Sequence, residues 1–389
     1  MYNIKIFNNI AKQGLAQFPQ DNYQVSDQAS NADAILLRSH KLQNEEIEAN
    51  VKAIGRAGAG TNNVPVEHCT DRGIPVFNAP GANANAVKEL VMAGLLLGSR
   101  GIVAGIDYAN GLADMDDADA MNKLLEKEKK KFKGSEIQGK TLGVVGLGAI
   151  GSLVANMALA MGMKVVGYDP AISIEAAWRL SGEIKKMDTI EALFASSDFI
   201  TLHLPVLDST RGLVNGALLS KAKSGCKLLN FARSEIVDSA DLVKALDKKQ
   251  IAAYIADFPK PGMMGRDDVI LMPHIGASTE EAEVNCAVMA AQQLKDYLEN
   301  GNVVNSVNFP RLVLERTSGH RLAISNRNVT NMLGSITSIL AEHELNVIDL
   351  LNKSRGDIAY NLIDVESKPS DAVIEQLSAV DGIVNVRLL

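Results

Sequence analysis

The chain has 389 residues, which allows two or three domains at roughly 100 to 200 residues each. Hydrophobic residues make up 47% of it and charged residues 22%, a balance that excludes a disordered or fibrous protein. The 39 Lys and Arg residues are outnumbered by 46 Asp and Glu residues, and the net charge of −7 argues against nucleic acid as the main partner.

Neither a membrane segment nor an export signal is indicated by the sequence. The longest strongly apolar stretch, residues 90–98, is far shorter than the roughly 20 residues that span a bilayer. The N-terminus starts in strand-like alternation, so we expect a cytoplasmic protein with no membrane partner. The cysteines are widely spaced and form no CxxC pair, which predicts reduced thiols and no metal site; they are Cys69, Cys226 and Cys286.

Short strands and two helical segments are predicted in the first 140 residues. Apolar residues at helical spacing predict one long helix over residues 86–110. The lysine-rich stretch at residues 124–133 carries two interleaved glutamates, which favours a solvated helix face over a nucleic-acid patch. The β-type runs, which suggest a small α/β layer, are residues 3–7, 34–37, 51–54 and 75–77.

Between residues 141 and 273 the pattern changes to strands that alternate with helices. This order predicts a parallel, doubly wound sheet with right-handed crossovers. A long helix is predicted next, over residues 280–298, and ends at Asn300-Gly301. The six predicted strands are residues 141–146, 164–169, 198–204, 227–232, 252–257 and 269–273.

The chain after Phe309-Pro310 has a different order of elements. Its pattern reads β-α-β-β-α-β, which is the ferredoxin-like order, with helices over residues 332–343 and 371–377. A polar linker at residues 315–319 predicts that residues 318–389 form a separate module.

A glycine motif supplies the strongest chemical signal. Residues 146–151 read GLGAIG, directly after a predicted strand and at the start of a predicted helix. Glycine lets the backbone turn tightly and approach a pyrophosphate at the helix N-terminus. Asp169 ends the next strand, where its carboxylate can bind ribose hydroxyls and repel the 2′-phosphate of NADP. The sequence therefore favours NAD; the alternatives are a purely structural glycine turn and an Asp that only caps the turn before Pro170.

Six ordered blocks extend this signal over nearly the whole chain. They are residues 55–64, 78–91, 139–151, 203–205, 230–238 and 273–279. Together they resemble the D-isomer-specific 2-hydroxyacid dehydrogenase family, and within it the branch that acts on 3-phospho-D-glycerate.

The resemblance implies an α/β fold with three domains. A doubly wound parallel NAD-binding (Rossmann) domain, residues 91–274, would be inserted in a flavodoxin-like substrate-binding domain made of residues 1–90 and 275–310, with the catalytic cleft between them. Residues 318–389 resemble an ACT domain, a ferredoxin-like βαββαβ unit that binds small regulatory ligands. We expect a homo-oligomer, either a dimer or a tetramer.

The resemblance assigns the catalytic chemistry to two residues. Arg233 would hold the substrate carboxylate, since a planar guanidinium can fix its orientation. His274 would act as general acid and base, which suits an imidazole near neutral pH. The family's histidine-orienting Glu is missing from residues 257–262, so we expect no Glu bonded to the ring, and Asp257, Asp267 or Asp268 could replace it.

Further residues are assigned by the same resemblance. The cofactor-binding residues would be Gly146, Gly148, Ala149, Ile150, Gly151, Asp169, His203, Leu204, Pro205, Ala232, Asp257 and Gly276. The substrate-binding residues would be Arg38, Ser39, Gly58 and Asn83. The weakest assignment is an amino-acid effector site at Asn326, Asn328 and Asn346, because the Pro-Gly pair common beside it is Thr330-Asn331 here.

The implied activity is NAD-dependent oxidation of 3-phospho-D-glycerate to 3-phosphohydroxypyruvate, the first step of serine biosynthesis. One alternative is a dehydrogenase of another D-2-hydroxy acid, which the missing Glu leaves open. Another is a non-catalytic NAD-sensing regulator on the same fold, since fold alone does not imply turnover. The presence of both Arg233 and His274 counts against the regulator.

Overall fold

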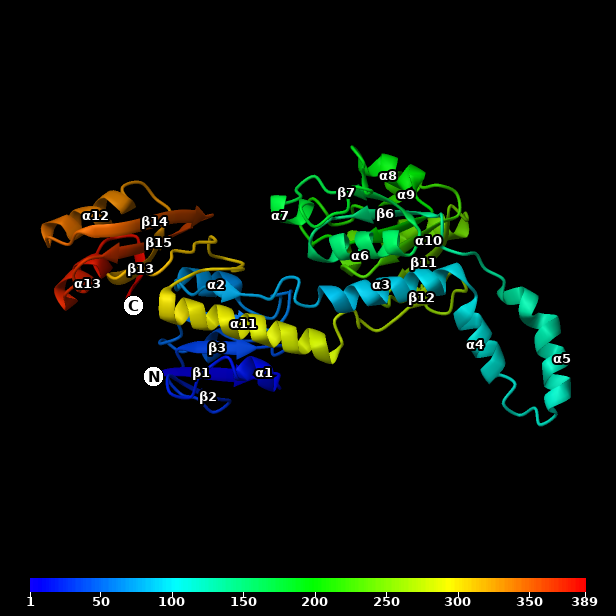
Figure 1. Ribbon diagram of the computed structural model, residues 1–389, viewed down its shortest axis with the longest axis horizontal. Helices are drawn as coiled ribbons and strands as arrows, with labels where there is room; N and C mark the ends of the chain where they lie inside the picture. Colours follow the sequence, from blue (N-terminus) through cyan, green and yellow to red (C-terminus); the bar gives the residue numbers. More distant parts are fainter. The chain divides into compact units, whose positions relative to one another are not determined.

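The computed structural model describes residues 1–389, apart from the side chain of Glu175. By its internal contacts the chain divides into two compact units (Figure 1). One unit combines Met1–Asn83 with Thr279–Leu389, and the other is Ala84–Ser278. Three domains were expected from the sequence, and the difference lies in residues 318–389, which belong to the first unit.

The unit Ala84–Ser278 is built on a seven-stranded parallel sheet with the order β12-β11-β10-β9-β6-β7-β8. This is the doubly wound arrangement, in which the order reverses between β6 and β9. The short strand β8 was not predicted, because two exposed lysines carry no strand pattern. The strands are β6 Thr141–Val145, β7 Lys164–Tyr168, β8 Lys185–Lys186, β9 Phe199–Leu202, β10 Cys226–Asn230, β11 Ile251–Ala256 and β12 Val269–Leu271.

Helices cover this sheet through two separate apolar cores. The first core includes α3 and α6, and the second includes α8, α9 and α10. The helices of the unit are α3 Ala84–Ser99, α4 Ile102–Asn110, α5 Ala118–Glu128, η2 Lys129–Phe132, α6 Ala149–Ala160, α7 Ile174–Ala177, α8 Ile190–Ser196, α9 Gly216–Leu219, η3 Ser234–Ile236 and α10 Ser239–Asp247.

The single helix predicted over residues 86–110 is wrong, because the chain bends by 73° between α3 and α4. The bend lies at Gly101, where a Cβ would lie 2.9 Å from the Cα of Phe132, so only glycine lets the two backbones pass. Beyond it, α4 and α5 have no buried residues and extend away from the sheet of their unit (Figure 1). No single described helix is long and apolar enough to cross a membrane; α3 and α4 meet that test only as a bent pair, by length and composition.

The other unit begins with a five-stranded parallel sheet of order β2-β1-β3-β4-β5, the flavodoxin-like order. Helix α11 packs on it, and a Cβ at Gly55 in β4 would lie 2.9 Å from Leu294. The strands are β1 Tyr2–Phe7, β2 Tyr23–Ser26, β3 Ala34–Leu37, β4 Ala53–Arg56 and β5 Val76–Phe77. The helices are α1 Lys12–Leu15, η1 Asn44–Glu46, α2 Val66–Asp71 and α11 Glu280–Asn300.

Residues 318–389, here called the terminal module, have the predicted β-α-β-β-α-β order. Their antiparallel sheet runs β14-β15-β13-β16, and α12 and α13 pack on one face through Leu322, Ile324 and Ile363. The elements are β13 His320–Arg327, α12 Met332–Glu342, β14 Val347–Arg355, β15 Ile358–Val365, α13 Asp371–Ser378 and β16 Ile383–Leu388.

The opposite face of this sheet is buried against the rest of its own unit. Ile358, Tyr360 and Leu362 share one core with residues of β1, β3 and α11. The Tyr360 hydroxyl donates to the carbonyl of Gly301 at 2.7 Å, just after α11 ends. The terminal module therefore has its own sheet and its own core on the helix side, and it shares a second core with the rest of the unit. The alternating strand pattern does not show what covers the second face of a sheet.

A buried ion pair connects the terminal module to the segment before it. Arg321 donates from Nε and Nη2 to the two carboxylate oxygens of Asp364 at 2.6 and 2.8 Å. Its remaining donors reach the carbonyls of Asn300, Leu314 and Glu315 at 2.8 to 3.1 Å. Burial alone would raise the pKa of Asp364, but the bonds from Arg321 and from the Thr317 hydroxyl outweigh it and lower this pKa. Both ions are therefore fully partnered.

Arg321→Met should destabilise the unit by about 3 to 5 kcal/mol, since it leaves the Asp364 carboxylate buried without its partner. Urea unfolding followed by circular dichroism measures this loss. Arg316→Met, at an exposed position five residues earlier, is the matched control and should change stability by less than about 0.5 kcal/mol. Equal unfolding midpoints for the two variants would show that the pair does not hold the module.

Candidate functional site

The glycine motif lies where the strand order of the seven-stranded sheet reverses. Gly146 follows β6 and His203 follows β9, and these two neighbouring strands continue into connections that leave in opposite directions. Gly146 has a φ of +89°, and a Cβ there would collide with the carbonyl of His203. In doubly wound sheets this crevice at the carboxyl ends of the strands is where ligands bind.

Each glycine of the motif has a different physical role. Gly151 packs so closely on the carbonyl of Gly146 that no side chain fits between them. Gly148 begins α6, and a Cβ at this position would meet no atom within 4 Å. The helix N-terminus at Ala149 and Ile150 therefore faces open space, as an arriving pyrophosphate requires.

Asp169 links the glycine loop to the end of β7. Its Oδ2 accepts the backbone N–H of Leu147 at 2.8 Å, and its Oδ1 accepts that of Ala171 at 2.9 Å. The side chain thus caps the turn, as one reading of the sequence proposed, and also fixes the glycine loop. A carboxylate has about four acceptor positions, so two remain for ribose hydroxyls.

Asp257 lies at the centre of the predicted catalytic residues. It is 1% exposed, and its Oδ2 accepts the N–H of Gly276 at 3.0 Å. Burial raises the pKa of Asp257, while the bond from Gly276 and the charges of His274 and Arg233 act in the opposite direction. Its Oδ1 is buried and has no hydrogen-bond partner among the described residues. That oxygen fits the amide of a nicotinamide ring, which would donate to it.

Arg233 lies in a turn that the Asn230 side chain stabilises through two hydrogen bonds. The fully buried Asn230 donates from Nδ2 to the carbonyl of Arg233 at 2.9 Å and accepts the N–H of Ala232 at 3.1 Å. Arg233 itself is half-buried and extended, and its guanidinium donates to the carbonyl of Ala232 at 2.7 Å. Asn230 was not predicted as a site residue, although it is the first residue of the same NFARSEIVD block.

His274 is exposed within its unit, and its ring lies against Phe258 at a centroid distance of 4.9 Å. No described carboxylate of Ala84–Ser278 hydrogen-bonds this ring. Asp257 instead bonds Gly276, and Asp268 pairs with Arg266. Within this unit, neither a Glu nor a neighbouring Asp takes the place of the missing residue.

His203 is placed to line the same crevice but not to carry charge. Burial lowers the pKa of His203 to about 3, so the ring is neutral. Its Nε2 contacts the Thr201 hydroxyl at 3.0 Å, while the buried Nδ1 has no partner among the described residues. Leu204 and Pro205 continue the predicted cofactor segment beside it.

In the other unit, Arg38 and Ser39 follow β3 at the point where the order of the five-stranded sheet reverses between β1 and β3. The Asn8 side chain, at the end of β1, accepts the N–H groups of Ser39 and His40 at 3.0 and 2.7 Å. This fixes the loop that presents Arg38. Ligands bind at such reversal points also in sheets of this order.

A second arginine, Arg56, which was not predicted as a site residue, lies on the strand next to that of Arg38. Arg56 is the last residue of β4 and pairs with Leu37, the last residue of β3, which directly precedes Arg38. Gly58, a predicted substrate residue, has a φ of +152°, and a Cβ there would collide with the Arg56 guanidinium. The sequence signal for Arg56 was the glycine-rich stretch GRAGAG around it, because Gly58 leaves room for the Arg56 side chain.

Glu283 on α11 changes the charge of this arginine cluster. Its Oε1 lies 2.6 Å from Nη2 of Arg38, and both side chains are about two-fifths exposed. Burial raises the pKa of the nearby Cys286 thiol, while the charges of Arg56 and Arg38 lower it and that of Glu283 raises it further. Asn83 is the last residue of the segment Met1–Asn83, and its buried Oδ1 has no hydrogen-bond partner among the described residues.

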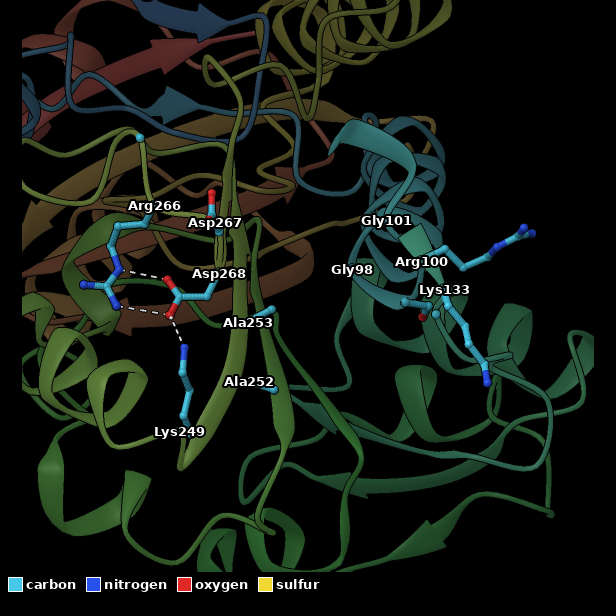
Figure 2. A pocket seen from close by; sticks show the side chains of 13 residues that line it. Gly98, Arg100, Gly101, Lys133, Lys249, Ala252, Ala253, Arg266, Asp267 and Asp268 are labelled. Atoms are coloured by element: carbon cyan, nitrogen blue, oxygen red, sulfur yellow. Dashed lines mark hydrogen bonds and ion pairs between the residues drawn. The ribbon is translucent and has the colours of Figure 1, made fainter. Parts of the chain in front are cut away.

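A cavity of about 650 Å³ lies elsewhere in Ala84–Ser278 (Figure 2). It is next to the amino ends of β11 and β12, whereas Asp257 and His274 follow their carboxyl ends. Figure 2 shows Asp268 between Arg266 and Lys249, with Arg100 and Lys133 pointing away from them. Asp267 and Asp268, two of the possible replacements for the orienting Glu, line this cavity, but none of the predicted catalytic, cofactor-binding or substrate-binding residues does, so it is not the candidate active site.

The three predicted effector residues are not brought together in one chain. Asn326 is buried in the sheet, where it donates to the carbonyl of Arg327 and accepts from the Asn361 amide at 2.8 Å. Asn328 and Asn346 are exposed, but they lie near opposite ends of β15. The three residues therefore do not form one site within a single chain.

Comparison with known proteins agrees with this geometry. Residues 106–276 match the NAD binding domain of the D-isomer specific 2-hydroxyacid dehydrogenases. A D-3-phosphoglycerate dehydrogenase of Haemophilus influenzae is 35% identical over 368 residues, which cover 90% of this chain and 85% of that protein. The chain belongs to the D-isomer-specific 2-hydroxyacid dehydrogenase family.

Two further members of the family are similar to this chain. A Synechocystis D-3-phosphoglycerate dehydrogenase is 39% identical over 74% of the chain, which spans about half, 51%, of that protein's length. The NAD⁺-bound 3-phosphoglycerate dehydrogenase of Entamoeba histolytica superposes with a TM-score of 0.62 at 29% identity, over 80% of this chain and 99% of its own. NAD is thus the cofactor of this dehydrogenase-family domain, as the glycine loop, Asp169 and the open oxygen of Asp257 predict.

Asp169→Ala should narrow the preference for NADH over NADPH by about ten-fold, because it removes the charge that repels a 2′-phosphate. Dissociation constants from isothermal titration measure this directly, without turnover. Asp116→Ala, at an exposed position of the same unit, is the control and should leave the preference unchanged. Equal affinity of the unmodified protein for both cofactors would contradict the role of Asp169.

Proposed function

We propose that this chain oxidises 3-phospho-D-glycerate to 3-phosphohydroxypyruvate with NAD, the first step of serine biosynthesis. The observation that carries the proposal is the grouping of Arg233 and His274 around Asp257, at the carboxyl edge of an NAD-binding sheet. The names of the relatives from Haemophilus influenzae and Synechocystis support the same substrate.

The residues of the chain divide the chemistry between them. Arg233 binds the substrate carboxylate through its planar guanidinium and so fixes the direction in which C2 points. His274 takes the proton of the C2 hydroxyl as the carbonyl forms. Bound NAD supplies the acceptor for the hydride that leaves C2. Asp257, Gly148 and Asp169 hold that cofactor in the proposal, through its amide, its pyrophosphate and its ribose.

The phosphate is assigned to the arginine cluster at the ends of β3 and β4. Arg38 and Arg56 provide two guanidinium groups on neighbouring strands, and Ser39 and Asn83 add polar groups. Guanidinium groups bind phosphate through charge-assisted bonds, and a substrate without phosphate does not need such a cluster.

One observation favours a second candidate, an unphosphorylated D-2-hydroxy acid. Glu283 partly neutralises Arg38, and a dianionic phosphate would have to displace it. A panel of D-2-hydroxy acids, assayed for NAD reduction, separates the candidates. The highest kcat/KM on 3-phospho-D-glycerate supports the proposal, the highest on an unphosphorylated acid supports the second candidate, and binding of NAD without any turnover indicates an NAD-sensing protein.

Arg38→Ala should raise the KM for 3-phospho-D-glycerate by about ten- to a hundred-fold, because it removes a charged hydrogen-bond donor to the phosphate. The KM for D-glycerate should stay nearly constant, and steady-state kinetics on both substrates give the comparison. An equal loss on both would remove the phosphate-binding role of Arg38.

Glu283→Gln should have the opposite effect on the phosphorylated substrate. Removing the carboxylate leaves Arg38 without a competing anion, and since exposed ion pairs are weak, we expect the KM to fall by only about two- to five-fold. The same kinetics, repeated with inorganic phosphate as a competitive inhibitor, should give a lower inhibition constant for the variant. A KM that rises instead would show that Glu283 helps to hold the substrate.

The proposal extends to the state of the protein in the cell. We propose a cytoplasmic homo-oligomer, a dimer or a tetramer, without nucleic-acid or membrane partners. In support, α4 exposes 38% of Val103 and 54% of Ile106 on a helix without buried residues.

An amino-acid effector at the terminal module would need residues from two chains, since Asn328 and Asn346 of one chain lie near opposite ends of β15. Light scattering of the purified protein with and without L-serine tests the oligomeric state and its response.

A further inference from the structure

The segment of residues 257–262, which lacks the family's glutamate, is fixed to both predicted catalytic groups. It follows β11 and reads Asp257-Phe258-Pro259-Lys260-Pro261-Gly262. Two prolines restrict the backbone on either side of Lys260, since each locks its φ near −65°. The segment is therefore stiff, and what its side chains contact is held in a defined place.

The first contact holds the imidazole. The rings of Phe258 and His274 lie 4.9 Å apart at an angle of 51°, which is a favourable tilted arrangement for an aromatic pair. Phe258 is half-buried, while His274 is exposed within its unit. On the described residues of this unit, Phe258 provides the one ring contact to His274, and no carboxylate bonds it.

The second contact holds the turn of Arg233. Lys260 donates from Nζ to the Ser239 hydroxyl at 2.8 Å and to the carbonyl of Ser234 at 3.3 Å. Ser234 directly follows Arg233, and Ser239 is the first residue of α10. Lys260 is half-buried, so these bonds are partly sheltered from water, and they hold the carbonyl of Ser234, whereas Asn230 holds that of Arg233.

The third contact joins the segment to the loop that carries the histidine. Asp257 accepts the N–H of Gly276, two residues after His274, at 3.0 Å. Phe258 and Asp257 thus contact the loop of His274, and Lys260 contacts the turn of Arg233. A change in the segment would shift the two groups relative to each other, and small errors in such geometry cost large factors in rate.

We propose that Phe258 and Lys260 are positioning residues: Phe258 positions the His274 ring in place of the orienting carboxylate, and Lys260 positions the Arg233 turn. The inference rests on the proposed function, because it assigns what the two residues do to proton transfer and to carboxylate binding. Neither side chain touches the reacting atoms. Their effects therefore separate in the kinetics: Phe258 acts on kcat and Lys260 on KM.

The first experiment compares Phe258→Leu with Phe258→Tyr. Leucine removes the flat ring, so His274 gains rotational freedom, and kcat should fall by about ten-fold with little change in the KM for 3-phospho-D-glycerate. Tyrosine keeps the ring and should restore kcat to within about two-fold of the unmodified enzyme. An unchanged kcat in Phe258→Leu, or a failure of tyrosine to rescue, overturns the role of Phe258.

The second experiment compares Lys260→Met with Lys260→Arg. Methionine keeps the apolar stem but not the two hydrogen bonds, so the KM for 3-phospho-D-glycerate should rise by about ten-fold while kcat changes less. Arginine can donate to the same oxygens and should stay closer to the unmodified enzyme. Lys221→Met, at an exposed position of the same unit, is the control and should change neither parameter. A fall in kcat alone for Lys260→Met contradicts the assignment.

A spectroscopic measurement tests the ring contact without turnover. In protein with ¹³C-labelled histidine, the His274 signals are assigned by their loss in His274→Asn. The Phe258 ring current should displace these signals, and Phe258→Leu should abolish the displacement while Lys260→Met and Phe258→Tyr largely keep it. Signals that do not move in Phe258→Leu overturn the inference. If the unmodified protein oxidises no D-2-hydroxy acid but these signals move, the proposed function fails while the contact stands.

Discussion

The reversal of strand order in two parallel sheets is the constraint on which the rest of the structure depends. At a reversal, neighbouring strands send their connections in opposite directions, and the carboxyl ends between them stay open. In one unit the reversal lies at the carboxyl ends of β6 and β9, and in the other it lies at those of β1 and β3. In each unit the order of the strands alone therefore predicts where a ligand binds, whatever the side chains are. The side chains at these strand ends then decide which ligand fits: NAD in the unit Ala84–Ser278 and, in the proposed function, the substrate phosphate in the other unit.

The terminal module adds a second constraint, because both faces of its sheet are covered within the chain. One face carries α12 and α13, and the other shares a core with β1, β3 and α11. The buried ion pair of Arg321 and Asp364 lies next to that core, since Arg321 donates to the carbonyl of the core residue Leu314. A module that merely hung on a linker could move freely, but this one cannot leave its place without exposing Tyr360 and its neighbours to water. Any effector of the module would act on a body that already includes the arginine cluster.

Much of this architecture could be predicted from the sequence, because local signals are strong where glycine and strand patterns coincide. The glycine loop, the six long strands and the β-α-β-β-α-β order needed only neighbouring residues. The bend at Gly101 was missed because its cause, the backbone of Phe132, lies 31 residues further on. Arg56 and Asn230 were missed although they lie inside matched blocks, since a block does not say which of its residues face a ligand. Ion pairs such as Arg38 with Glu283, 245 residues apart, leave no local pattern at all.

Two features of the candidate site share a physical theme, because each concerns the partner of a charged or ionisable group in the proposed reaction. His274 has an aromatic neighbour in its own unit instead of a bonded carboxylate, and Arg38 has a carboxylate beside it before substrate arrives. For Arg38, phosphate binding is then an exchange of one ion pair for another, so its free energy is the difference between the two. In the proposed reaction a phosphate dianion would displace Glu283, because it carries more charge and more acceptor oxygens than a carboxylate. An unphosphorylated acid has nothing at that end with which to displace Glu283. On this proposal, the carboxylate that weakens phosphate binding would also keep Arg38 from binding weaker anions, so selectivity would come from competition with Glu283 rather than from shape.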